Sequence, residues 1–486
     1  MQKLQLSKHL EIVPRQNDYA VYHKLFGNLS LLDDVGVELL HSFAEPQDLL
    51  EEKLARSPSL KGYLDELCDR FFLVPEGSDE RSIVEDDKRF REQNLESGYL
   101  LKGIQLVLAD DCNLGCSYCF QETIQHSTPP RQSLLRVLPT TAAAPAEKSS
   151  EHVKRMSFDT AILAVENAIE VARKAGNRAL GLEFFGGEPL LNWPVIEQVL
   201  DHFGTGEKNG VTLFYSITTN ATKVTDAIAR KLRQHRVTVT VSFDSPKNVE
   251  RVTKAGTSAD PAIHRGLETL SRNDAILTFN TVVSVDNVDR VDVEGLLAAA
   301  KQHKVRQIGL ILDLAIQPYE DRERMKKVVD TILLICARGR EEGIAITGYW
   351  HQIFEQILGI QALNLQKGYK TCAAEGCKLS FEPDGAITVC KTAEKPLGSA
   401  ADLPEVFKTP WYKTSAMKAY ETTPYCRGCA IEGFCSGLCL GTIQKTFNNI
   451  TTLVTPACDV YRELTQRLIQ SVPDQQVEKL YLSALQ

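Results

Sequence analysis

The feature that most constrains this chain is a group of three closely spaced cysteines. Cys112, Cys116 and Cys119 form the pattern CxxxCxxC. This spacing is typical of an iron-sulfur cluster held by three thiolates, with one iron left without a protein ligand. An open iron can chelate a small molecule, so we interpret the loop as a reactive centre. Zinc also binds short cysteine runs, but it needs a fourth ligand and usually shows CxxC pairs.

Two apolar segments frame the site expected around this loop. Residues 103–109 are partly alternating and predict a strand that delivers the cysteine loop. A second such run, residues 180–185, ends in Gly186-Gly187-Glu188-Pro189. The glycines let the backbone approach a ligand closely, and the Glu188 carboxylate suits an ammonium group.

On these residues the chain resembles the radical S-adenosylmethionine enzymes, which share the CxxxCxxC loop, an aromatic residue before its third cysteine, and the GGEP turn. The resemblance implies that Cys112, Cys116 and Cys119 ligate a 4Fe-4S cluster. That cluster would cleave S-adenosylmethionine reductively to a 5'-deoxyadenosyl radical. The residues expected to bind the cofactor are Tyr118, Gly186, Gly187, Glu188, Pro189, Thr219, Asn220, Ser242 and Arg251. For the last four, an ordinary role as a turn or cap competes with ligand binding.

Eight further cysteines lie in the C-terminal third. The first three read CxxxxC and then a cysteine five residues after Gly385, and the region 426–439 reads CxxCxxxxxCxxxC. This pattern resembles the SPASM extension of radical enzymes that modify peptides and proteins. The resemblance implies two auxiliary 4Fe-4S clusters, three in all, with ligand sets Cys372, Cys377, Cys390 and Cys439, and Cys426, Cys429, Cys435 and Cys458. Cys68 and Cys336 lie among apolar residues at helical spacing and are interpreted as buried small hydrophobic residues.

Between residues 99 and 343, strand-like and helix-like segments alternate. After the first strand, the predicted strands are 179–186, 212–220, 238–244, 277–287 and 307–316, and the predicted helices are 158–175, 193–203, 225–235, 261–272 and 293–303. Six strands separated by helices predict a parallel sheet, and the resemblance makes it a partial (β/α)6 TIM-like barrel in an α/β fold. Both loops that carry chemistry follow strands, so we expect them to meet at the carboxyl ends of the strands.

Residues 1–98 are expected to form a separate small α+β domain. The expected elements are strands at 19–26 and 29–32, a helix capped at Asp33 or Asp34, a helix at 60–72, a strand at 73–74 and an acidic linker from 76 to 87. This order resembles the winged-helix-like domain that binds a leader peptide by adding it to a sheet edge. A plain structural cap on the barrel explains the same pattern.

Two further segments complete the domain plan. Residues 121–150 are expected to be a flexible insertion or a lid, because 125–150 contain Pro129-Pro130 and few apolar positions. Residues 344–486 are expected to form the SPASM domain and to end in a helix.

Composition predicts the compartment and excludes some partners. The 13 cysteines are an odd number in 486 residues, and Met1-Gln2-Lys3 opens a segment without an apolar signal, so a reducing cytoplasm is expected. No apolar run approaches 18 residues, which predicts no membrane span. A net charge of -8 argues against a general nucleic-acid surface.

For the reaction we favour maturation of a ribosomally made precursor peptide that carries a leader. Hydrogen abstraction and loss of a second electron to an auxiliary cluster would form a thioether or carbon-carbon crosslink, with a flavodoxin or ferredoxin-type protein as electron donor. Sulfatase-type formylglycine formation is disfavoured, because Lys391 follows Cys390 where sulfatase-maturing members have an aspartate base. Amino-acid excision and epimerisation stay open. Asp313 is a candidate proton acceptor, although a hydrogen-bonded strand carboxylate fits it as well.

Two other classes of protein fit part of the pattern. A non-catalytic carrier with several clusters would need no GGEP turn, and only a distant fourth cysteine would complete its first cluster. A zinc-binding adaptor has its best support in the CxxC of Cys426 and Cys429. Formation of 5'-deoxyadenosine distinguishes an enzyme from both.

Overall fold

The centre of the molecule is a curved, largely parallel sheet. The computed structural model describes residues 3–47, 58–119, 135–136, 154–244, 250–312, 321–359, 370–420 and 423–473. The successive parallel strands are β6 (Gly103–Val107), β8 (Ala179–Phe185), β10 (Val211–Thr219), β11 (Thr238–Ser242), β12 (Ile276–Val283), β13 (Gln307–Leu312) and β14 (Ala345–Thr347). Each pairs in parallel with the next. This one-directional winding is the expected partial barrel.

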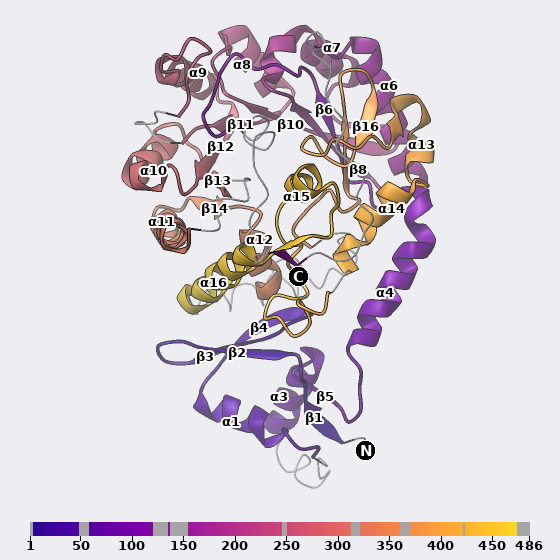
Figure 1. Cartoon of the computed structure of the whole chain (residues 1–486), viewed down its shortest axis with the longest axis vertical. Coiled ribbons are helices and arrows are strands. Elements are labelled where there is room, and N and C mark those ends of the chain that lie inside the picture. The colour runs from indigo at the N-terminus through magenta and orange to yellow at the C-terminus, as the bar shows by residue number, and fades with distance from the viewer. Residues whose placement is uncertain are drawn as a thin grey trace.

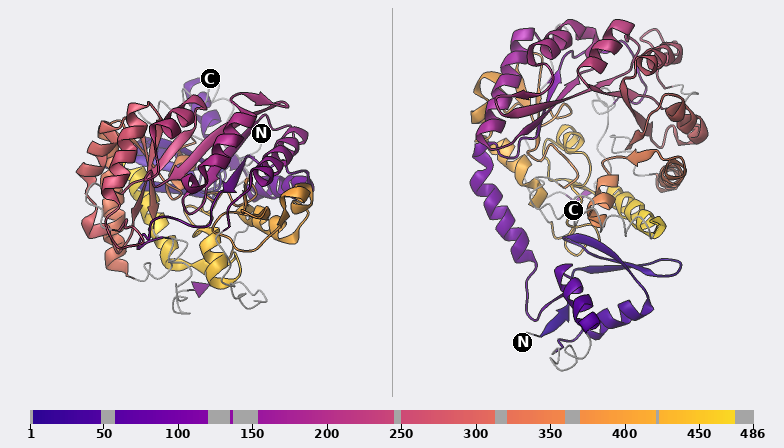
Figure 2. Two further views of the ribbon diagram at one scale, coloured as in Figure 1. Left: turned by 90° about the horizontal axis from the view of Figure 1, so that it is seen from above. Right: turned by 180° about the vertical axis from the view of Figure 1, so that it is seen from behind.

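Helices cover the convex face of this sheet, as Figures 1 and 2 show. They are α6 (Phe158–Lys174), α7 (Trp193–Phe203), α8 (Asp226–Gln234), α9 (Asp260–Arg272), α10 (Val293–Gln302) and α11 (Arg322–Glu341). Several begin where a side chain accepts a backbone N–H of the first turn, as Ser157 does for α6 and Thr225 for α8. The predicted helices are confirmed, and the strand predicted to reach residue 287 ends at Val283.

Alternation along the strands explains how the sheet and helices pack. In β10, Val211, Leu213, Tyr215 and Ile217 are buried, while the residues between them are more exposed. Because successive side chains of a strand point to opposite faces, one face of β10 packs in the core and the other faces the concave side of the sheet.

The C-terminal region continues the sheet beyond its first strand. Strand β15 (Lys378–Phe381) pairs in parallel with β6, and β16 (Ala386–Thr388) and β17 (Gly398–Ser399) follow in antiparallel order. The sheet therefore extends across the predicted boundary at 343. The helices here are α12 (His351–Leu358), α13 (Leu403–Val406), α14 (Pro410–Met417), α15 (Leu440–Phe447) and α16 (Thr455–Ser471). Figure 1 shows α15 on the concave side of the sheet.

Two short strand pairs lie outside the main parallel array. β9 (Glu207–Lys208) pairs in antiparallel fashion with β10. β7 (Leu135–Arg136) pairs with β18 (Leu453–Val454), just before α16. The rest of the predicted insertion at 121–150 lies outside the described residues.

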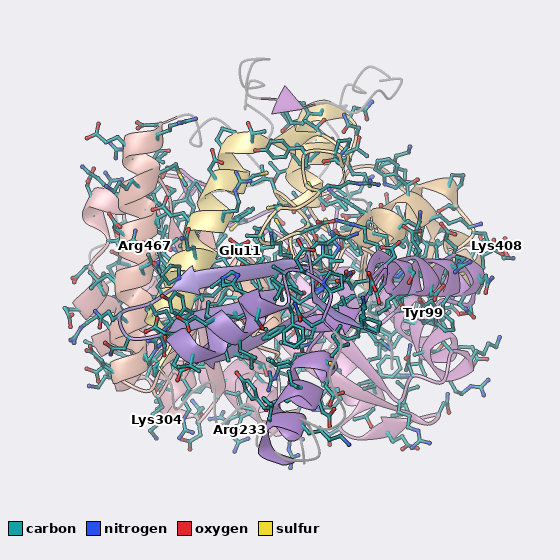
Figure 3. All side chains as sticks on the ribbon, turned by 90° about the horizontal axis from the view of Figure 1, so that it is seen from below. Glu11, Tyr99, Arg233, Lys304, Lys408 and Arg467 are labelled. Carbon is teal, nitrogen blue, oxygen red and sulfur yellow. The ribbon has the colours of Figure 1, made fainter. Side chains whose placement is uncertain are left out.

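The N-terminal domain contains the expected hairpin, two helices and last strand, but the hairpin turn lies at 24–26, before the predicted 27–28, and the strands Leu4–Leu6 and Leu10–Pro14 were not predicted. Its elements are β1 (Leu4–Leu6), β2 (Leu10–Pro14), β3 (Tyr19–His23), β4 (Gly27–Leu32), α1 (Asp34–Ser42), α3 (Pro58–Asp69) and β5 (Leu73–Pro75). Strands β2, β3 and β4 form an antiparallel sheet, and β1 pairs with β5. Asp33 caps α1 by accepting the Gly36 N–H at 2.8 Å. Figure 3 shows this domain from below, with Glu11 on β2.

The acidic linker expected at 76–87 is wrong, because most of that segment belongs to helix α4 (Arg81–Asn94). The helix is very polar, but it is attached to the C-terminal region through Arg91. The buried Arg91 guanidinium donates to the Ala416 carbonyl at 2.7 Å and lies over the Tyr420 ring. The sequence pattern missed this helix because polar contacts of its arginines, and not an apolar stripe, attach it to the C-terminal region. In the described part of the chain, no helix has the length and apolar character needed to cross a bilayer.

Candidate active site

The cysteine loop leaves the carboxyl end of β6 and is fixed by the segment 250–253. Gly115 N–H donates to the Val252 carbonyl at 2.8 Å, and Ser117 N–H donates to the Glu250 carbonyl at 3.2 Å. These contacts tie the loop after β6 to the segment that follows β11, a strand that lies beyond β8 and β10 in the sheet.

The structure brings Cys112, Cys116 and Cys119 together. The pKa of Cys116 is raised to about 11, mainly by burial. The Arg251 guanidinium acts in the opposite direction, and the neighbouring thiols of Cys112 and Cys119 add to the increase. Three adjacent thiols in a half-buried loop are costly as thiolates unless a cation compensates them. The donor set therefore fits a metal cluster, and the loop would hold it through these three sulfurs.

The GGEP turn packs directly on the backbone of the cysteine loop. Gly187 N–H donates to the Ala109 carbonyl at 2.9 Å, and Glu188 N–H donates to the Asp111 carbonyl at 3.0 Å. A Cβ atom on Gly186 would lie 2.5 Å from the Ala109 oxygen. The two glycines are thus required for contact between two loops, in addition to any approach to a ligand.

Glu188 joins the ends of β8 and β10 through a buried carboxylate. It is 1% exposed and accepts hydrogen bonds from Thr219 Oγ1 at 2.7 Å, Asn220 N–H at 2.7 Å and Leu190 N–H at 3.0 Å. Burial raises the pKa of Glu188, and these hydrogen bonds act in the opposite direction. The sequence interpretation assigned the carboxylate to a ligand ammonium group, whereas in the structure both oxygens already bind the protein.

Asn220 lies between this turn and the first cysteine. Its Nδ2 is 3.6 Å from Cys112 Sγ and 3.0 Å from Asn113 Oδ1. A hydrogen bond from an amide to a cluster thiolate stabilises the negative charge on sulfur and tunes the potential of the cluster. Thr219 and Asn220 therefore lie beside the cysteine loop and contact the protein, and their role in cofactor binding stays a prediction.

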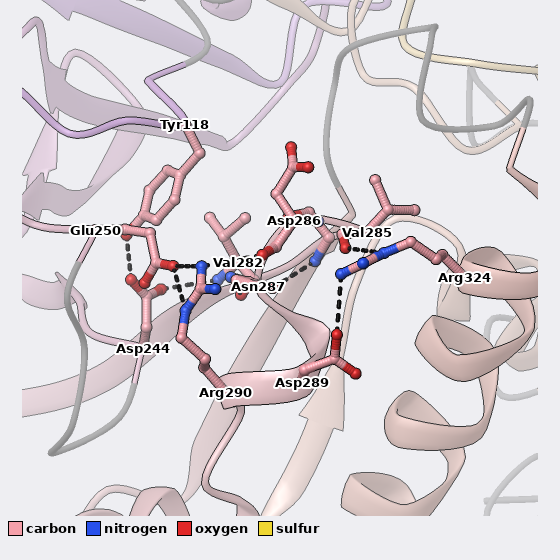
Figure 4. A network of polar contacts seen from close by, with 11 residues as sticks. Tyr118, Asp244, Glu250, Val282, Val285, Asp286, Asn287, Asp289, Arg290 and Arg324 are labelled. Atoms are coloured by element: carbon pink, nitrogen blue, oxygen red, sulfur yellow. Dashed lines mark hydrogen bonds and ion pairs between the residues drawn. The ribbon is translucent and has the colours of Figure 1, made fainter.

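A buried network fixes the other side of the loop. Arg251 Nε donates to Asp244 Oδ2 at 3.0 Å, and the Tyr118 hydroxyl donates to the same carboxylate. The Arg251 guanidinium also lies 5.3 Å from the centroid of the Tyr118 ring. Asp244 Oδ1 accepts the Val282 N–H at 2.9 Å, which ties the network to β12. Figure 4 shows Tyr118 and Asp244 in contact.

Arg251 therefore already has a carboxylate partner within the protein. The sequence interpretation expected it to meet a ligand carboxylate and did not single out Asp244, although Asp244 ends a predicted strand. In the sequence, this pair shows only as an acidic residue seven positions before an arginine. That spacing is too common to identify a buried ion pair. Ser242 ends β11 and is half-buried, and Pro189 is buried at the start of a 3-10 helix, Pro189–Asn192. Asp313 lies outside the described residues.

A second polar network supports the 250–253 segment from outside. Arg290 Nε donates to Glu250 Oε1 at 3.0 Å, and Arg324 pairs with Asp289 at 3.0 Å (Figure 4). Arg324 lies in the first turn of α11, so this chain of contacts connects the cysteine loop with the far end of the barrel. Glu250 is mostly buried, but its partner Arg290 and the pair of Arg324 and Asp289 are half-exposed and screened by solvent, unlike the buried network.

Four C-terminal cysteines surround one cavity. Cys426, Cys429, Cys435 and Cys458 all line it, together with Arg462. Burial raises the pKa of Cys458, and the neighbouring Cys435, Cys426 and Cys429 raise it further. Arg462 Nη1 lies 3.9 Å from Cys429 Sγ and supplies a cation beside the sulfurs. A cavity lined by four thiols and an arginine fits the second predicted auxiliary cluster.

Three of the four cysteines predicted for the other auxiliary cluster also come together. Burial raises the pKa of Cys372 most strongly, and the neighbouring Cys439, Glu375 and Cys390 raise it further. For the fourth, Cys377, burial raises the pKa to about 12, and the next influences come from Arg91, Lys102 and Glu375. Glu375 also acts on Cys372, so both cysteines have this carboxylate as a neighbour. Cys377 therefore stays the predicted fourth ligand of this group.

The described cysteine groups are not arranged like the ligands of a single ion. Within the described part of the chain, no three His, Cys, Asp or Glu side chains converge on one metal position. A cuboidal cluster binds each thiolate at a different iron, so its ligands surround a volume and need not converge on a point.

Comparisons with known proteins agree with this geometry. Residues 106–300 match the Radical SAM superfamily. The chain is 32% identical over 475 residues, 96% of both chains, to the radical SAM cyclopropyl synthase TigE of Paramaledivibacter caminithermalis. The fold matches anSMEcpe with bound AdoMet, with a TM-score of 0.58, 18% identity and coverage of 76% of this chain and 100% of that one. It also matches Streptococcus suis SuiB bound to precursor peptide SuiA, with a TM-score of 0.50, 13% identity and coverage of 94% and 99%.

Proposed function

Because this chain belongs to the radical S-adenosylmethionine enzyme family, we propose that it modifies a precursor peptide by closing a carbon-carbon bond. The observation that carries the proposal is the match to the cyclopropyl synthase, which extends over 96% of both chains and so includes the N-terminal and cysteine-rich regions. It favours the carbon-carbon product over the thioether. The bond would close a cyclopropane ring within one side chain of the peptide.

The residues of the barrel rim would hold the reactive group. Cys112, Cys116 and Cys119 would bind the first 4Fe-4S cluster, and the GGEP turn, Asn220 and Ser242 would border the S-adenosylmethionine pocket. When bound, these groups and the auxiliary clusters supply a 5'-deoxyadenosyl radical and an acceptor for one further electron. The Glu188 and Asp244 carboxylates would keep the loop in place while the peptide is bound.

The proposed reaction balances as the loss of two hydrogen atoms from the peptide. One leaves as a hydrogen atom that ends in 5'-deoxyadenosine, and the other leaves as a proton and an electron while two carbon atoms join. Cleavage of each S-adenosylmethionine also consumes one electron, for which we propose a flavodoxin or ferredoxin-type donor. The cytoplasm is the compartment consistent with such donors and with reduced thiols.

Product mass distinguishes this reaction from its alternatives. The enzyme, purified without oxygen, is incubated with reductant, S-adenosylmethionine and a peptide encoded beside its gene. We expect 5'-deoxyadenosine and a peptide lighter by two hydrogen atoms, with the change confined to one residue in fragmentation spectra. A change that links two residues indicates a crosslink, an unchanged mass indicates epimerisation, and loss of a fragment indicates excision. If no 5'-deoxyadenosine forms, the result favours a non-catalytic electron carrier with several clusters.

Formylglycine formation is a weaker candidate for this chain. Lys391 follows Cys390, and its Nζ lies 3.9 Å from Asp110 Oδ1 at the end of β6. A lysine paired with a carboxylate keeps its proton and is a poor general base. Incubation with a sulfatase-derived peptide is therefore expected to leave the peptide mass unchanged.

For the N-terminal domain we propose leader recognition. Its three-stranded sheet has β2 and β4 as outer strands, and within the described ranges each outer strand has one edge without a strand partner. Gly27, at the start of β4, abuts α12, since a Cβ there would lie 2.7 Å from the Gln356 carbonyl oxygen. This contact favours β2 as the strand that a leader would extend. Hydrogen exchange with and without leader should show protection at residues 10–14, and unchanged exchange throughout 3–47 would indicate a structural cap.

A further inference from the structure

The turn between β3 and β4 packs against the loop that carries the second group of C-terminal cysteines. Gly433 lies between Cys429 and Cys435, two of the cysteines that line the cavity. The Gly433 N–H donates to the Lys24 carbonyl at 2.9 Å. A Cβ atom on Gly433 would lie 2.3 Å from the Leu25 carbonyl oxygen. The two backbones therefore touch with no room for a side chain at this position.

Lys24 also joins this turn to the outer strand β2. Its N–H donates at 2.7 Å to the carbonyl of His9, the residue just before β2. Its Nζ lies 3.2 Å from Oε2 of Glu11, which belongs to β2. One residue thus contacts both the cysteine loop and the strand that the proposed leader would extend.

A buried ion pair fastens the same loop to helix α4. Arg81 donates to both carboxylate oxygens of Glu432, at 2.6 and 2.9 Å, and the Glu432 side chain is 1% exposed. Glu432 Oε2 also accepts the N–H of Gly428, which lies between Cys426 and Cys429, at 2.8 Å. A buried carboxylate is costly without its partners, so the loop and the start of α4 are held together.

The residue before Arg81 fastens the start of α4 to the N-terminal domain. Glu80 is 4% exposed and accepts a hydrogen bond from Ser7 Oγ at 2.5 Å. His23 Nε2 lies 3.8 Å from Glu80 Oε1, and His23 Nδ1 accepts the Leu25 N–H at 3.2 Å. Two adjacent residues therefore connect the β3–β4 turn and the cysteine loop through a second, independent route.

Cluster binding and leader binding would act on this one set of contacts. Metal ligation is coupled to folding, so a cluster would order the loop from residue 426 to 435. A leader strand added to β2 would order β2 and the turn that Lys24 holds against it. Each event favours the arrangement in which Lys24 and Gly433 touch, so each strengthens the other by linkage.

We propose that leader binding to the N-terminal domain stabilises the second auxiliary cluster through the contact between the β3–β4 turn and the loop 426–435, and that the cluster in return strengthens leader binding. The inference rests on the leader recognition and the second auxiliary cluster proposed above. Couplings of this kind typically change an affinity by about 5 to 150-fold. A chain without this cluster would then bind precursor weakly and leave it to intact enzyme.

The test uses the full-length chain with Cys112, Cys116 and Cys119 replaced by alanine, so that only auxiliary clusters release iron. Release of iron to a chelator is followed without and with a saturating synthetic leader, taken from the peptide encoded beside the gene. Fluorescence anisotropy of the labelled leader gives its Kd before and after the chelator has removed the iron. This comparison needs no change at the interface.

Three variants in the same background then locate the coupling. Gly433→Ala places a methyl group against the Leu25 carbonyl, and Arg81→Gln removes the cation from Glu432. Both keep every C-terminal cysteine. Arg89→Gln is the control, because it breaks an exposed ion pair with Asp86 on the same helix.

Bound leader should slow the release of about half of the iron, that of one of two clusters, by about fivefold or more. The chelator reaches that iron by local opening of the loop, which the leader disfavours. The leader should bind less tightly once the iron is removed. Arg89→Gln should keep the slowing, whereas Gly433→Ala and Arg81→Gln should reduce it to less than about twofold.

Two results overturn the coupling and leave leader recognition intact. One is a leader that binds but changes neither iron release nor, after iron removal, its own Kd. The other is equal slowing in all three variants. A leader that does not bind refutes leader recognition and the coupling together, and a chain that holds iron for only one auxiliary cluster refutes the second cluster and the coupling.

Discussion

The barrel loop and the C-terminal cysteine region position sulfur in different ways. In the barrel, three cysteines follow one strand, and carboxylates from other strand ends hold the loop through Glu188 and Asp244. In the C-terminal region the cysteines are distributed over loops and helix α16, and the segment 426–439 supplies sulfurs to both groups. The sheet therefore arranges the first site, whereas we expect the proposed clusters to stabilise the C-terminal region by binding. Loss of one cysteine in the barrel should therefore affect only the cluster of the barrel loop. Loss of one cysteine in the C-terminal region should affect both cysteine groups.

The largest expected effect comes from removing one cysteine in each region. Cys116→Ala should reduce 5'-deoxyadenosine formation below detection and remove about four iron atoms, with resistance to protease retained. Cys435→Ala should remove iron from both auxiliary clusters and expose the C-terminal region to protease, because Cys439 lies on the same turn. Iron analysis and limited proteolysis check both. Loss of a single cluster with unchanged proteolysis in Cys435→Ala would contradict the shared stabilisation.

A smaller effect is expected when the loop support in the barrel is changed. Arg251→Lys keeps the charge but cannot contact both Asp244 oxygens and the Tyr118 ring as a guanidinium does. Since supporting contacts of metal ligands typically contribute 10 to 100-fold, we expect a decrease of about that size in 5'-deoxyadenosine formation per first cluster.

The matched control is Arg290→Lys in the exposed network around Glu250. Arg290 is half-exposed, so its pair with Glu250 is screened by solvent. In this variant, 5'-deoxyadenosine formation per first cluster should change by less than about twofold. Equal losses in the two variants would show that the outer network holds the loop as strongly as the buried one, which contradicts the comparison.

The C-terminal region has its own buried pair, which offers a further comparison. Arg81 of α4 donates to both carboxylate oxygens of Glu432, at 2.6 and 2.9 Å, and Glu432 lines the cavity of the second cysteine group. Arg81→Ala leaves a buried carboxylate without its cation, so we expect a loss of about 1 to 3 kcal/mol in the free energy of unfolding. Lys413→Ala removes an exposed pair with Glu96 and should cost less than about 1 kcal/mol.

The same pair predicts a pH dependence. Burial raises the pKa of Glu432, but hydrogen bonds from Arg81 and from the Gly428 N–H outweigh this and hold the pKa below 4.5. A folded-state pKa below the unfolded value stabilises the fold fully above the unfolded value and loses this effect as pH falls. The difference in thermal stability between the natural chain and Arg81→Ala should therefore be constant above about pH 5 and shrink at lower pH. A constant difference down to pH 3 would contradict the role of Glu432.

The smallest effect is expected for the cysteines assigned to neither region. Burial raises the pKa of Cys336 to about 12, which keeps its thiol protonated and unreactive. Cys336→Ala and Cys68→Ala should retain all iron and lower stability by about 1 kcal/mol or less. Lost iron in either variant would assign that cysteine to a cluster and change the comparison.

Sequence patterns predicted the barrel closely because its helices and strands follow simple periods. Helix Trp193–Phe203 has the predicted bounds, and strand β8 ends at the predicted glycine turn. The patterns failed at α4, where contacts of Arg81 and Arg91 with the C-terminal region replace an apolar stripe. They also missed Asp244, whose importance depends on neighbours far away in the chain.

The sequence by itself determined the elements that local chemistry specifies: the cysteine loop, the glycine turn, the repeated strands and helices, and the inventory of sulfur ligands. Local spacing is enough there because a loop of eight residues or one period of a helix contains all the information that it needs. The tertiary structure alone decided which carboxylates are buried and what they contact. It showed Glu188 and Asp244 as supports of the loop, because the desolvation of a charge is set by the whole fold.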